Sequence, residues 1–259
     1  MRLSISRIKA FKSCRRLYEL KYLEHLEPAQ KPEALEVGSS YHKLLEEINN
    51  GNMDALDTDY SKANAMAIAY HKYIYPNFHV VEAEKWFEFD LGNGDKLVGC
   101  VDAIADDGCI VEHKSVGSEI TEAYEYNLQW DEQILAYMLV TGARKVYYTV
   151  CRKPTIRQKQ NETEEEFFAR MVAWYDEDTE SKIRLLTITR TDDEIEQFRD
   201  DLMFMVDEMR HAGYFYKNTC HCNMWGRRCE YSSVCLHYDP NQEYVEFVKK
   251  EEDYEPTEN

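Results

Sequence analysis

The chain has 259 residues, 44% of them hydrophobic, with 31 Lys and Arg against 49 Asp and Glu and a net charge of −18. That length can bury one sizeable core, and the absence of any run of 18 apolar residues excludes a transmembrane helix. The basic segment 1–14 lacks the continuous apolar stretch of a signal peptide, so we expect a cytoplasmic protein.

Hydrophobic periodicity predicts an alternation of helices and strands. Apolar residues at helical spacing predict helices at residues 4–24, 34–49, 61–75, 127–140, 163–175 and 192–211. Alternating apolar residues predict strands at residues 87–91, 96–105, 109–114, 145–151 and 183–189. Thr163 and Glu166 have the spacing of a capping box at the start of a helix. This order indicates an α/β or α+β fold with a mixed sheet.

The most informative segment is the predicted hairpin at residues 99–114. Asp102 lies on its first strand, and Glu112 and Lys114 lie on its second strand. Since strand side chains alternate with period two, Glu112 and Lys114 share a face. Two carboxylates and an ammonium group are what a hard divalent cation and a phosphodiester require. The alternative is an ordinary hairpin with solvated charges.

The negative charge is unevenly distributed. Residues 1–31 hold eight Lys and Arg against three Glu, and residues 152–160 hold four cations and no acid. Residues 239–259 form an acidic tail with eight carboxylates. The two basic stretches could contact phosphates through Arg7, Lys12, Arg15, Arg16, Lys153, Arg157 and Lys159. The alternative is that these side chains face open solvent.

The eight cysteines suggest a metal centre, because thiols in a reducing compartment are more often ligands or buried groups than disulfides. Three of them are close together near the end of the chain: Cys222, Cys229 and Cys235. Cys14 is the best candidate for a fourth thiolate, and four thiolates suit a [4Fe–4S] cluster. Zinc is the rival, with other donors nearby in the sequence at Cys220, His221 and His237. Three cysteines in predicted strands are expected to be buried: Cys100, Cys109 and Cys151.

Five elements in this order resemble the PD-(D/E)XK nuclease superfamily, between Ser4 and Cys235. They are Gly38-x-x-x-His42, Asp102 after a glycine, Glu112-x-Lys114, Gln133-x-x-x-Tyr137, and Cys14 with the three late cysteines. The cysteine pattern is similar to that of the RecB-like, iron–sulfur branch. That branch includes CRISPR-adaptation exonucleases, AddB-type helicase–nucleases and stand-alone phage nucleases.

The resemblance implies a restriction-endonuclease-like αβββαβ core with a mixed sheet. Helical N-terminal and Cys-rich C-terminal segments would be additions to that core. We therefore expect one nuclease domain over residues 1–238. Its parts would be N-terminal helices at 1–50, a nuclease core at 80–190 and a cluster segment at 192–238, followed by the tail at 239–259.

The resemblance also implies roles for individual residues. Mg²⁺ or Mn²⁺ would be held by His42, Asp102, Glu112 and the backbone carbonyl of His113. Lys114 would position the attacking water or stabilise the developing charge, and Gln133 and Tyr137 would support the site. Glu84 is a candidate for an additional or supporting ligand. The [4Fe–4S] cluster would be held by Cys14, Cys222, Cys229 and Cys235.

The expected function is that of a metal-dependent deoxyribonuclease. It would act as an exonuclease on single-stranded DNA ends in phage or bacterial replication, recombination or repair. The sequence has no P-loop, so a helicase or recombinase activity would come from a partner. The alternative is a non-catalytic DNA-binding or assembly subunit that keeps the fold and cluster. A zinc protein with no role on nucleic acid would require the hairpin pattern to be chance.

Overall fold

The computed structural model describes residues 1–30, 32–57, 59–224, 227–236 and 245–250. The zinc candidate His237 and most of the predicted acidic tail, at 239–244 and 251–259, lie outside these residues. The chain divides into two compact units. One comprises Met1–Lys31, Asp90–Leu97 and Asp201–Asn259, and the other comprises Pro32–Phe89 and Val98–Asp200.

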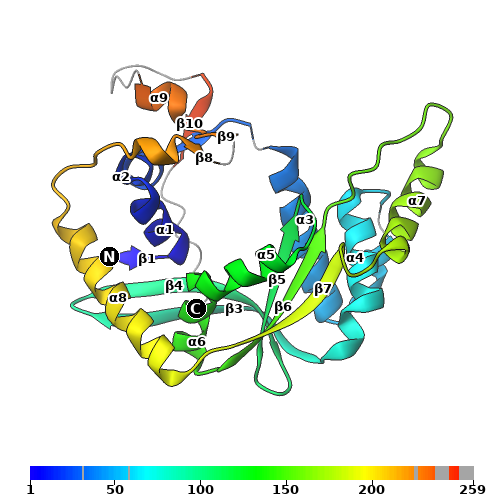
Figure 1. Ribbon diagram of the computed structural model, residues 1–259, viewed down its shortest axis with the longest axis horizontal. Coiled ribbons are helices and arrows are strands. Elements are labelled where there is room, and N and C mark those ends of the chain that lie inside the picture. Colours follow the sequence, from blue (N-terminus) through cyan, green and yellow to red (C-terminus); the bar gives the residue numbers. More distant parts are fainter. Residues whose placement is uncertain (31, 58, 225–226, 237–244, 251–259) are drawn as a thin grey trace. The chain divides into compact units, whose positions relative to one another are not determined.

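The elements confirm the predicted mixed α/β fold (Figure 1). The helices are α1 (Ile5–Ser13), α2 (Arg15–Tyr18), α3 (Glu33–Asn49), α4 (Lys62–Tyr73), α5 (Glu122–Asn127), α6 (Glu132–Thr141), α7 (Glu164–Glu177), α8 (Asp192–His211) and α9 (Ser232–Leu236). The strands are β1 (Arg2–Leu3), β2 (Leu26–Pro28), β3 (Val80–Gly92), β4 (Asp95–Ala105), β5 (Ile110–Val116), β6 (Lys145–Arg152), β7 (Ile183–Thr189), β8 (Asn223–Met224), β9 (Arg227–Arg228) and β10 (Phe247–Lys249). None of the helices in the described residues is long and apolar enough to cross a membrane.

The main sheet has six strands in the order β1-β4-β5-β6-β7, with β3 also paired to β4. β4 and β5 are antiparallel, as the hairpin predicted, and β5 and β6 are parallel. The β5 to β6 connection passes through α5 and α6, which is the crossover that a parallel pair requires. β7 then returns antiparallel to β6. The sheet is therefore mixed, with β5 at its centre.

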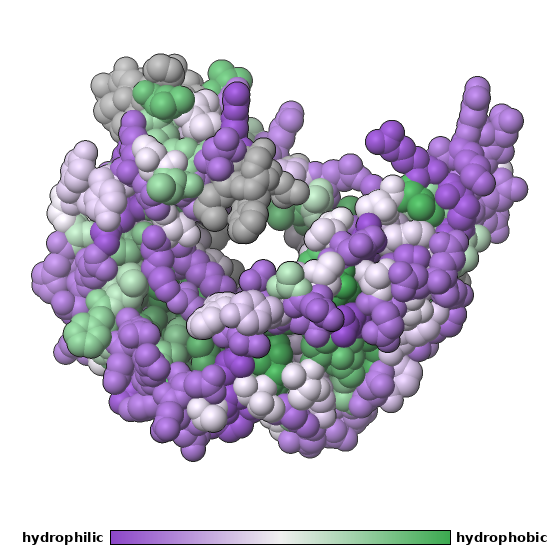
Figure 2. Space-filling model, viewed as in Figure 1, coloured by the Kyte–Doolittle hydropathy of each residue, from purple (hydrophilic) through white to green (hydrophobic). Residues whose placement is uncertain are grey.

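Helices cover both faces of the sheet in the larger unit. On one face α3, α4 and α7 enclose an apolar core that includes Tyr41, Tyr70 and Tyr175. On the other face α6 packs against strand residues that include Val101 and Val146. β5 and β6 are buried over much of their length, and three polar side chains, Glu112, His113 and Thr149, are buried along with their apolar residues. Figure 2 shows hydrophilic side chains over α7, which begins with three glutamates.

Local sequence signals account for many element boundaries. The predicted capping box at Thr163 and Glu166 is present at the start of α7. Ser4 caps α1, Asp131 caps α6, and Gly142 ends α6 in the left-handed conformation that glycine adopts without a Cβ penalty. The turn between β3 and β4 uses positive φ angles at Asn93 and Gly94, two residue types that tolerate this conformation.

Two predicted helices are interrupted in the structure. The helix expected at 4–24 breaks at Cys14, which is extended, and continues as α2 and a π-helical turn at Glu19–Leu23. The helix expected at 127–140 begins only at Glu132, because the preceding residues form a separate helix α5 and a 3₁₀ turn at Leu128–Trp130. Apolar periodicity continues across both breaks, so it could not reveal them.

The smaller unit contains most of the predicted cysteine cluster region. Leu20, Tyr231 and Val234 form its local core, with Cys229 and Cys235 packed against them. β10 pairs antiparallel with β2, and the β8–β9 hairpin precedes α9. These strands of two or three residues were not predicted, because they are too short to show alternation.

Candidate active site

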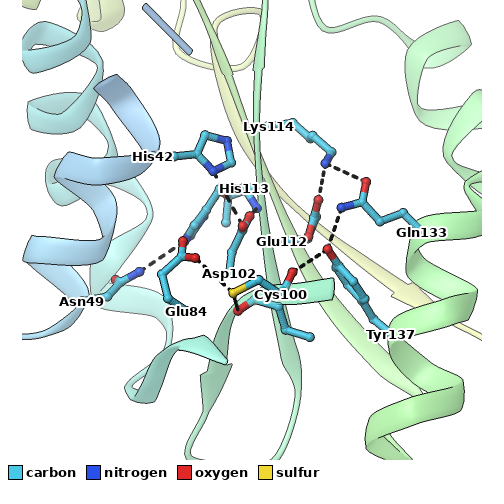
Figure 3. Close-up of polar contacts among 12 residues, drawn as sticks. His42, Asn49, Glu84, Cys100, Asp102, Glu112, His113, Lys114, Gln133 and Tyr137 are labelled. Carbon is cyan, nitrogen blue, oxygen red and sulfur yellow. Dashed lines mark hydrogen bonds and ion pairs between the residues drawn. The ribbon is translucent and has the colours of Figure 1, made fainter. Parts of the chain in front are cut away.

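The predicted site residues meet around the end of β5, with α3 on one side and α6 on the other (Figure 3). β4 supplies Asp102, and β5 supplies Glu112, His113 and Lys114. All of them belong to the larger unit. Extended strands hold these backbones rigidly, so the side chains from neighbouring strands are kept close together.

Glu112 begins a chain of polar contacts that runs to α6. The Lys114 ammonium contacts Glu112 Oε1 and donates a hydrogen bond to Gln133 Oε1 at 3.1 Å. Gln133 Nε2 donates to the Tyr137 hydroxyl at 2.7 Å, and that hydroxyl donates to the Cys100 carbonyl at 2.6 Å. The structure therefore brings Glu112, Lys114, Gln133 and Tyr137 into one network. Gln133 and Tyr137 are one turn apart on α6, as their spacing indicated.

Asp102 is held from two directions. The backbone amide of His113 donates to Asp102 Oδ2 at 2.7 Å. His42 on α3 places its Nδ1 atom 3.6 Å from Asp102 Oδ1. Figure 3 shows His42 directed from α3 toward Asp102, so the predicted Gly-x-x-x-His helix does contribute to this site.

The two carboxylates have opposite electrostatic environments. Burial, followed by repulsion from Asp102, raises the pKa of Glu112 to about 7 even though Lys114 opposes this. Burial also acts to raise the pKa of Asp102, but hydrogen bonding and charge at His42 and His113 outweigh it, and the net shift is downward. At pH 7 Asp102 is therefore ionised, whereas Glu112 is partly protonated.

The His113 side chain lies away from Glu112, in a buried polar cluster. Its Nδ1 atom is 2.7 Å from Thr149 Oγ1, and its Nε2 atom is 3.2 Å from Asn49 Nδ2. Tyr70 donates to Asn49 Oδ1 at 2.9 Å. Burial lowers the pKa of His113 to about 4, so the ring is neutral at pH 7. This cluster joins β5 to α3 and α4.

Glu84 lies beside the site in an uncommon backbone conformation, with φ of 50°. Cys100 Sγ donates to Glu84 Oε2 at 3.0 Å. Burial raises the pKa of Glu84, and the charges of Asp102 and Glu46 add to the effect. Cys109 and Cys151 are buried as expected, whereas Cys100 is only partly buried because it faces Glu84.

Gly38 allows α3 to approach the end of β5. A Cβ atom at this position would lie 3.2 Å from Ser115 Oγ, which is tighter than ordinary contact. Lys153 donates to that hydroxyl at 2.7 Å and to the Ser115 carbonyl at 3.2 Å. The basic character of residues 152–160 predicted Lys153 as a phosphate contact. In the structure Lys153 contacts Ser115, the residue directly after Lys114.

A sequence profile of the PD-(D/E)XK nuclease superfamily matches residues 2–69 and 59–236, which together span most of the chain. The chain belongs to the PD-(D/E)XK nuclease superfamily. This confirms the resemblance inferred from the five motifs at the level of the superfamily. No curated protein matches the sequence closely enough to count as a relative.

Solved structures are similar to this chain to different degrees. A candidate exonuclease from Eubacterium rectale aligns with a TM-score of 0.52 at 14% identity, covering 91% of this chain and 92% of its own. A phage-related exonuclease from Haemophilus somnus aligns with a TM-score of 0.36 at 13% identity, covering 71% of this chain and 89% of its own. The first of these structures supports the assignment of the fold.

Nucleases of this superfamily typically use divalent metals. Within the described residues no group of three or more His, Cys, Asp or Glu side chains is arranged to hold a metal ion. One atom nevertheless fits such an ion, because Glu112 Oε2 is buried and has no hydrogen-bond partner among the residues that the structure describes. An oxygen in that state is costly unless it is protonated or meets a cation. The donor set of two carboxylates and an imidazole suits Mg²⁺ or Mn²⁺.

The four predicted cluster cysteines belong to the smaller unit. Burial raises the pKa of Cys229 and of Cys235, and the thiols of Cys14 and Cys222 raise both further. Lys217 and Arg16 oppose the shift at Cys235. Asn218 contacts Cys14 as well as Cys222, since its amide donates to Cys14 Sγ at 3.3 Å. Cys14 is buried and Cys222 is exposed, with Cys222 Sγ 3.7 Å from the Asn218 carbonyl.

The predicted phosphate-binding residues fall into two groups. In the smaller unit Arg15 pairs with Glu208 and lies over the rings of Phe11 and Tyr216, and Arg16 pairs with Glu19. Arg7 donates to the carbonyls of residues 2 and 22, and Lys12 also has an interaction partner. In the larger unit Arg157 and Lys159 are exposed on the loop after β6. The second group is the more available to a phosphate backbone.

Asn49 was not identified from the sequence, although it contacts the His113 ring directly. It lies seven residues after His42, so both occur on one side of α3. That spacing was the available signal. The parts played by Cys100 and Ser115 had no such signal, because both depend on packing between separate elements.

Proposed function

We propose that this protein is a metal-dependent deoxyribonuclease whose active site is formed by Asp102, Glu112 and Lys114. The observation that carries the proposal is the buried, unpartnered Glu112 Oε2 atom beside Asp102 and Lys114. Neither a solvated hairpin nor an ordinary ion pair requires such an atom. A positively charged ligand at this oxygen would satisfy it and would favour the ionised form of Glu112.

Asp102, Glu112 and His42 would hold Mg²⁺ or Mn²⁺, together with the backbone carbonyl of His113. When bound, the cation would lower the pKa of a water molecule and neutralise charge on the scissile phosphate. Lys114 is held by Glu112 and Gln133. From there its ammonium can donate to the attacking water or to an oxygen that gains charge during hydrolysis.

Gln133 and Tyr137 would act as positioning residues. Tyr137 is anchored to the Cys100 carbonyl and accepts a hydrogen bond from Gln133, which fixes the Gln133 amide so that its oxygen faces Lys114. This arrangement limits the rotamers of Lys114 before substrate arrives. A fixed cation stabilises developing charge without further reorganisation.

We also propose exonuclease action on single-stranded ends, in phage or bacterial replication, recombination or repair. The five-motif resemblance favours this substrate, and the similar structure from Eubacterium rectale is named an exonuclease. Exposed cations on the loop after β6, with Lys153, would contact the phosphates. A helicase or recombinase partner would supply the strand separation.

A structural [4Fe–4S] cluster held by Cys14, Cys222, Cys229 and Cys235 completes the proposal. Its support is the spacing of the cysteines, the packing of Cys229 and Cys235 against one local core, and the contacts of Asn218 with both Cys14 and Cys222. Protein purified without oxygen should be brown, with broad absorption near about 400 nm, and should contain iron. A colourless sample with stoichiometric zinc would replace the cluster with a zinc site. Cys14→Ser should lower both iron content and stability.

The deciding experiment is incubation of anaerobically purified protein with end-labelled single- and double-stranded DNA, with Mn²⁺, Mg²⁺ or a chelator. Metal-dependent release of mononucleotides or short products from one end is expected. The alternative function, a non-catalytic DNA-binding or assembly subunit, predicts binding without cleavage under every metal condition. Internal cleavage of circular single strands would replace exonuclease with endonuclease action.

A further inference from the structure

Two aromatic side chains are exposed on the segment that connects β5 to α6. Tyr126 on α5 retains 58% of its accessible surface, and Trp130 in the following 3₁₀ turn retains 69%. Single exposed aromatics are common on protein surfaces. These two are unusual because they are four residues apart, about one helical turn, and occur in a segment attached to the active site.

The segment is anchored to the sheet at its start and joined to the active site at its end. The Tyr124 hydroxyl lies 3.3 Å from that of Tyr148 on β6, which fixes the start of the segment. Asp131 follows Trp130 directly and caps α6 through the amide of Gln133. Gln133 in turn contacts Lys114. The two rings therefore belong to the same local structure as the proposed catalytic lysine.

The segment is also rigidly supported. Leu128, between the two rings, is buried in the core on the α6 face of the sheet. Arg190 donates to the carbonyls of Leu128 and Gln129 at 3.1 and 2.9 Å. Arg184 pairs with Glu125. The rings are thus presented on a fixed backbone, which reduces the entropy lost when a flat ligand stacks on them.

The charge of the segment restricts what it could bind. Residues 117–133 contain five acidic residues and no lysine or arginine. Such a surface repels a phosphate backbone, so the attraction must come from the ring faces. Nucleic acid bases have flat π faces that stack on aromatic side chains whatever their sequence. In a duplex those faces are covered by neighbouring base pairs, and in a single strand they are free.

We propose that Tyr126 and Trp130 form a stacking platform for unpaired bases next to the scissile phosphate. The inference rests on the proposed nuclease function and adds to it the residues that recognise unpaired bases near the cleaved bond. The two rings select substrate by its bases while Lys114 and the carboxylates act on its phosphodiester. They are positioning residues and take no part in proton transfer.

The test is a double-mutant cycle in which either the protein rings or the DNA bases are removed and the affinity is measured. A chelator is present so that no cleavage occurs. Fluorescein-labelled single-stranded oligonucleotides are titrated with the wild type, Tyr126→Ala, Trp130→Ala and the double variant. Each single substitution should weaken binding about tenfold. An oligonucleotide with abasic sites near its end should bind the wild type as weakly as it binds the double variant. Tyr60→Ala is the control, because Tyr60 is 51% exposed but packs against Phe168.

Conservative variants separate stacking from a merely structural effect. Trp130→Phe should keep the affinity and lose the quenching of tryptophan emission that DNA causes in the wild type. With metal added, the double variant should show a raised KM and a retained kcat on single strands. Equal affinity of the double variant and the wild type for the normal oligonucleotide would overturn the platform. So would a change in oligomeric state with unchanged DNA binding, which would indicate a protein interface.

Failure of this inference can be told apart from failure of the proposed function. If the wild type cleaves no DNA with any metal, the nuclease proposal fails while the binding cycle in chelator can still be read. If the wild type cleaves single strands and the double variant does so with the same KM, only the platform is wrong.

Discussion

The ammonium group of Lys114 contacts one carboxylate oxygen of Glu112, while the other oxygen of Glu112 is buried without a hydrogen-bond partner in the described part of the chain. The ion pair with Lys114 therefore satisfies only one of the two carboxylate oxygens of Glu112. Burial of an ionised carboxylate is costly unless its remaining lone pairs are satisfied. The arrangement is suited to a cation that binds the second oxygen.

Glu112→Gln should lower the rate of DNA cleavage by at least about 100-fold, since it removes charge needed at the site with little change in shape. The metal-free variant should unfold at the same temperature as the wild type or higher, because the buried carboxylate is replaced by a neutral group. Single-turnover cleavage and thermal denaturation measure the two effects. Asp176→Asn, at an exposed ion pair with Lys72, should leave cleavage unchanged.

Mn²⁺ should raise the unfolding temperature of the wild type, since a ligand that binds only the folded state stabilises it by about 2.7 kcal/mol at 100 times its Kd. Asp102→Asn and Glu112→Gln should each abolish most of that increase. This measurement is independent of activity. Equal increases in the wild type and both variants would place the metal elsewhere.

His113→Leu should destabilise the protein by about 2 to 5 kcal/mol. The substitution leaves polar groups of Asn49 and Thr149 buried without their present partner, at about 1–3 kcal/mol each. Urea denaturation gives the change in the free energy of unfolding. Combining the substitution with Thr149→Val should cost less than the sum of the two single changes. Additive costs would mean that the two side chains do not interact.

Neutralising Arg157 and Lys159 together should flatten the salt dependence of single-strand binding by about 1.4 log units per log unit of salt, or about 0.7 for each phosphate contact. Neutralising Arg15 and Arg16 should change this slope less. Their guanidinium groups already pair with Glu208 and Glu19, so their removal should mainly lower stability. Affinity measured at several salt concentrations gives both slopes, and the reverse order would assign the DNA path to the N-terminal helices.

The Glu162–Arg170 pair should make stability depend on pH at the acid end. Hydrogen bonds from Arg170 lower the pKa of Glu162 from 4.5 to about 2. The lowered pKa means that the stabilisation is present above pH 4.5 and is lost as pH falls through about 2. Glu162→Gln should therefore be less stable than the wild type at pH 6, and the two proteins should converge near pH 2. A constant difference across this range would exclude the titration of Glu162 as the cause.

Much of the local structure could be predicted because it depends on neighbouring residues. Alternation along β5 places Glu112 and Lys114 on one face, whatever the rest of the chain does. The Thr163 capping box and the turn at Asn93 and Gly94 follow from side-chain and backbone preferences within a few residues. The superfamily was also accessible, because its motifs combine residue types at fixed spacing.

Only the tertiary structure determined which distant groups meet. The position of His42 near Asp102 depends on how α3 packs against the sheet, and the contact of Gln133 with Lys114 depends on the α6 crossover. Burial of the free Glu112 oxygen results from all of these elements together. The break of the first helix at Cys14 also depends on distant residues, since the amide of Asn218 donates to the Cys14 sulfur. Such contacts join residues far apart in the chain. They depend on the free energy of packing between separate elements, which the spacing of neighbouring residues does not reveal.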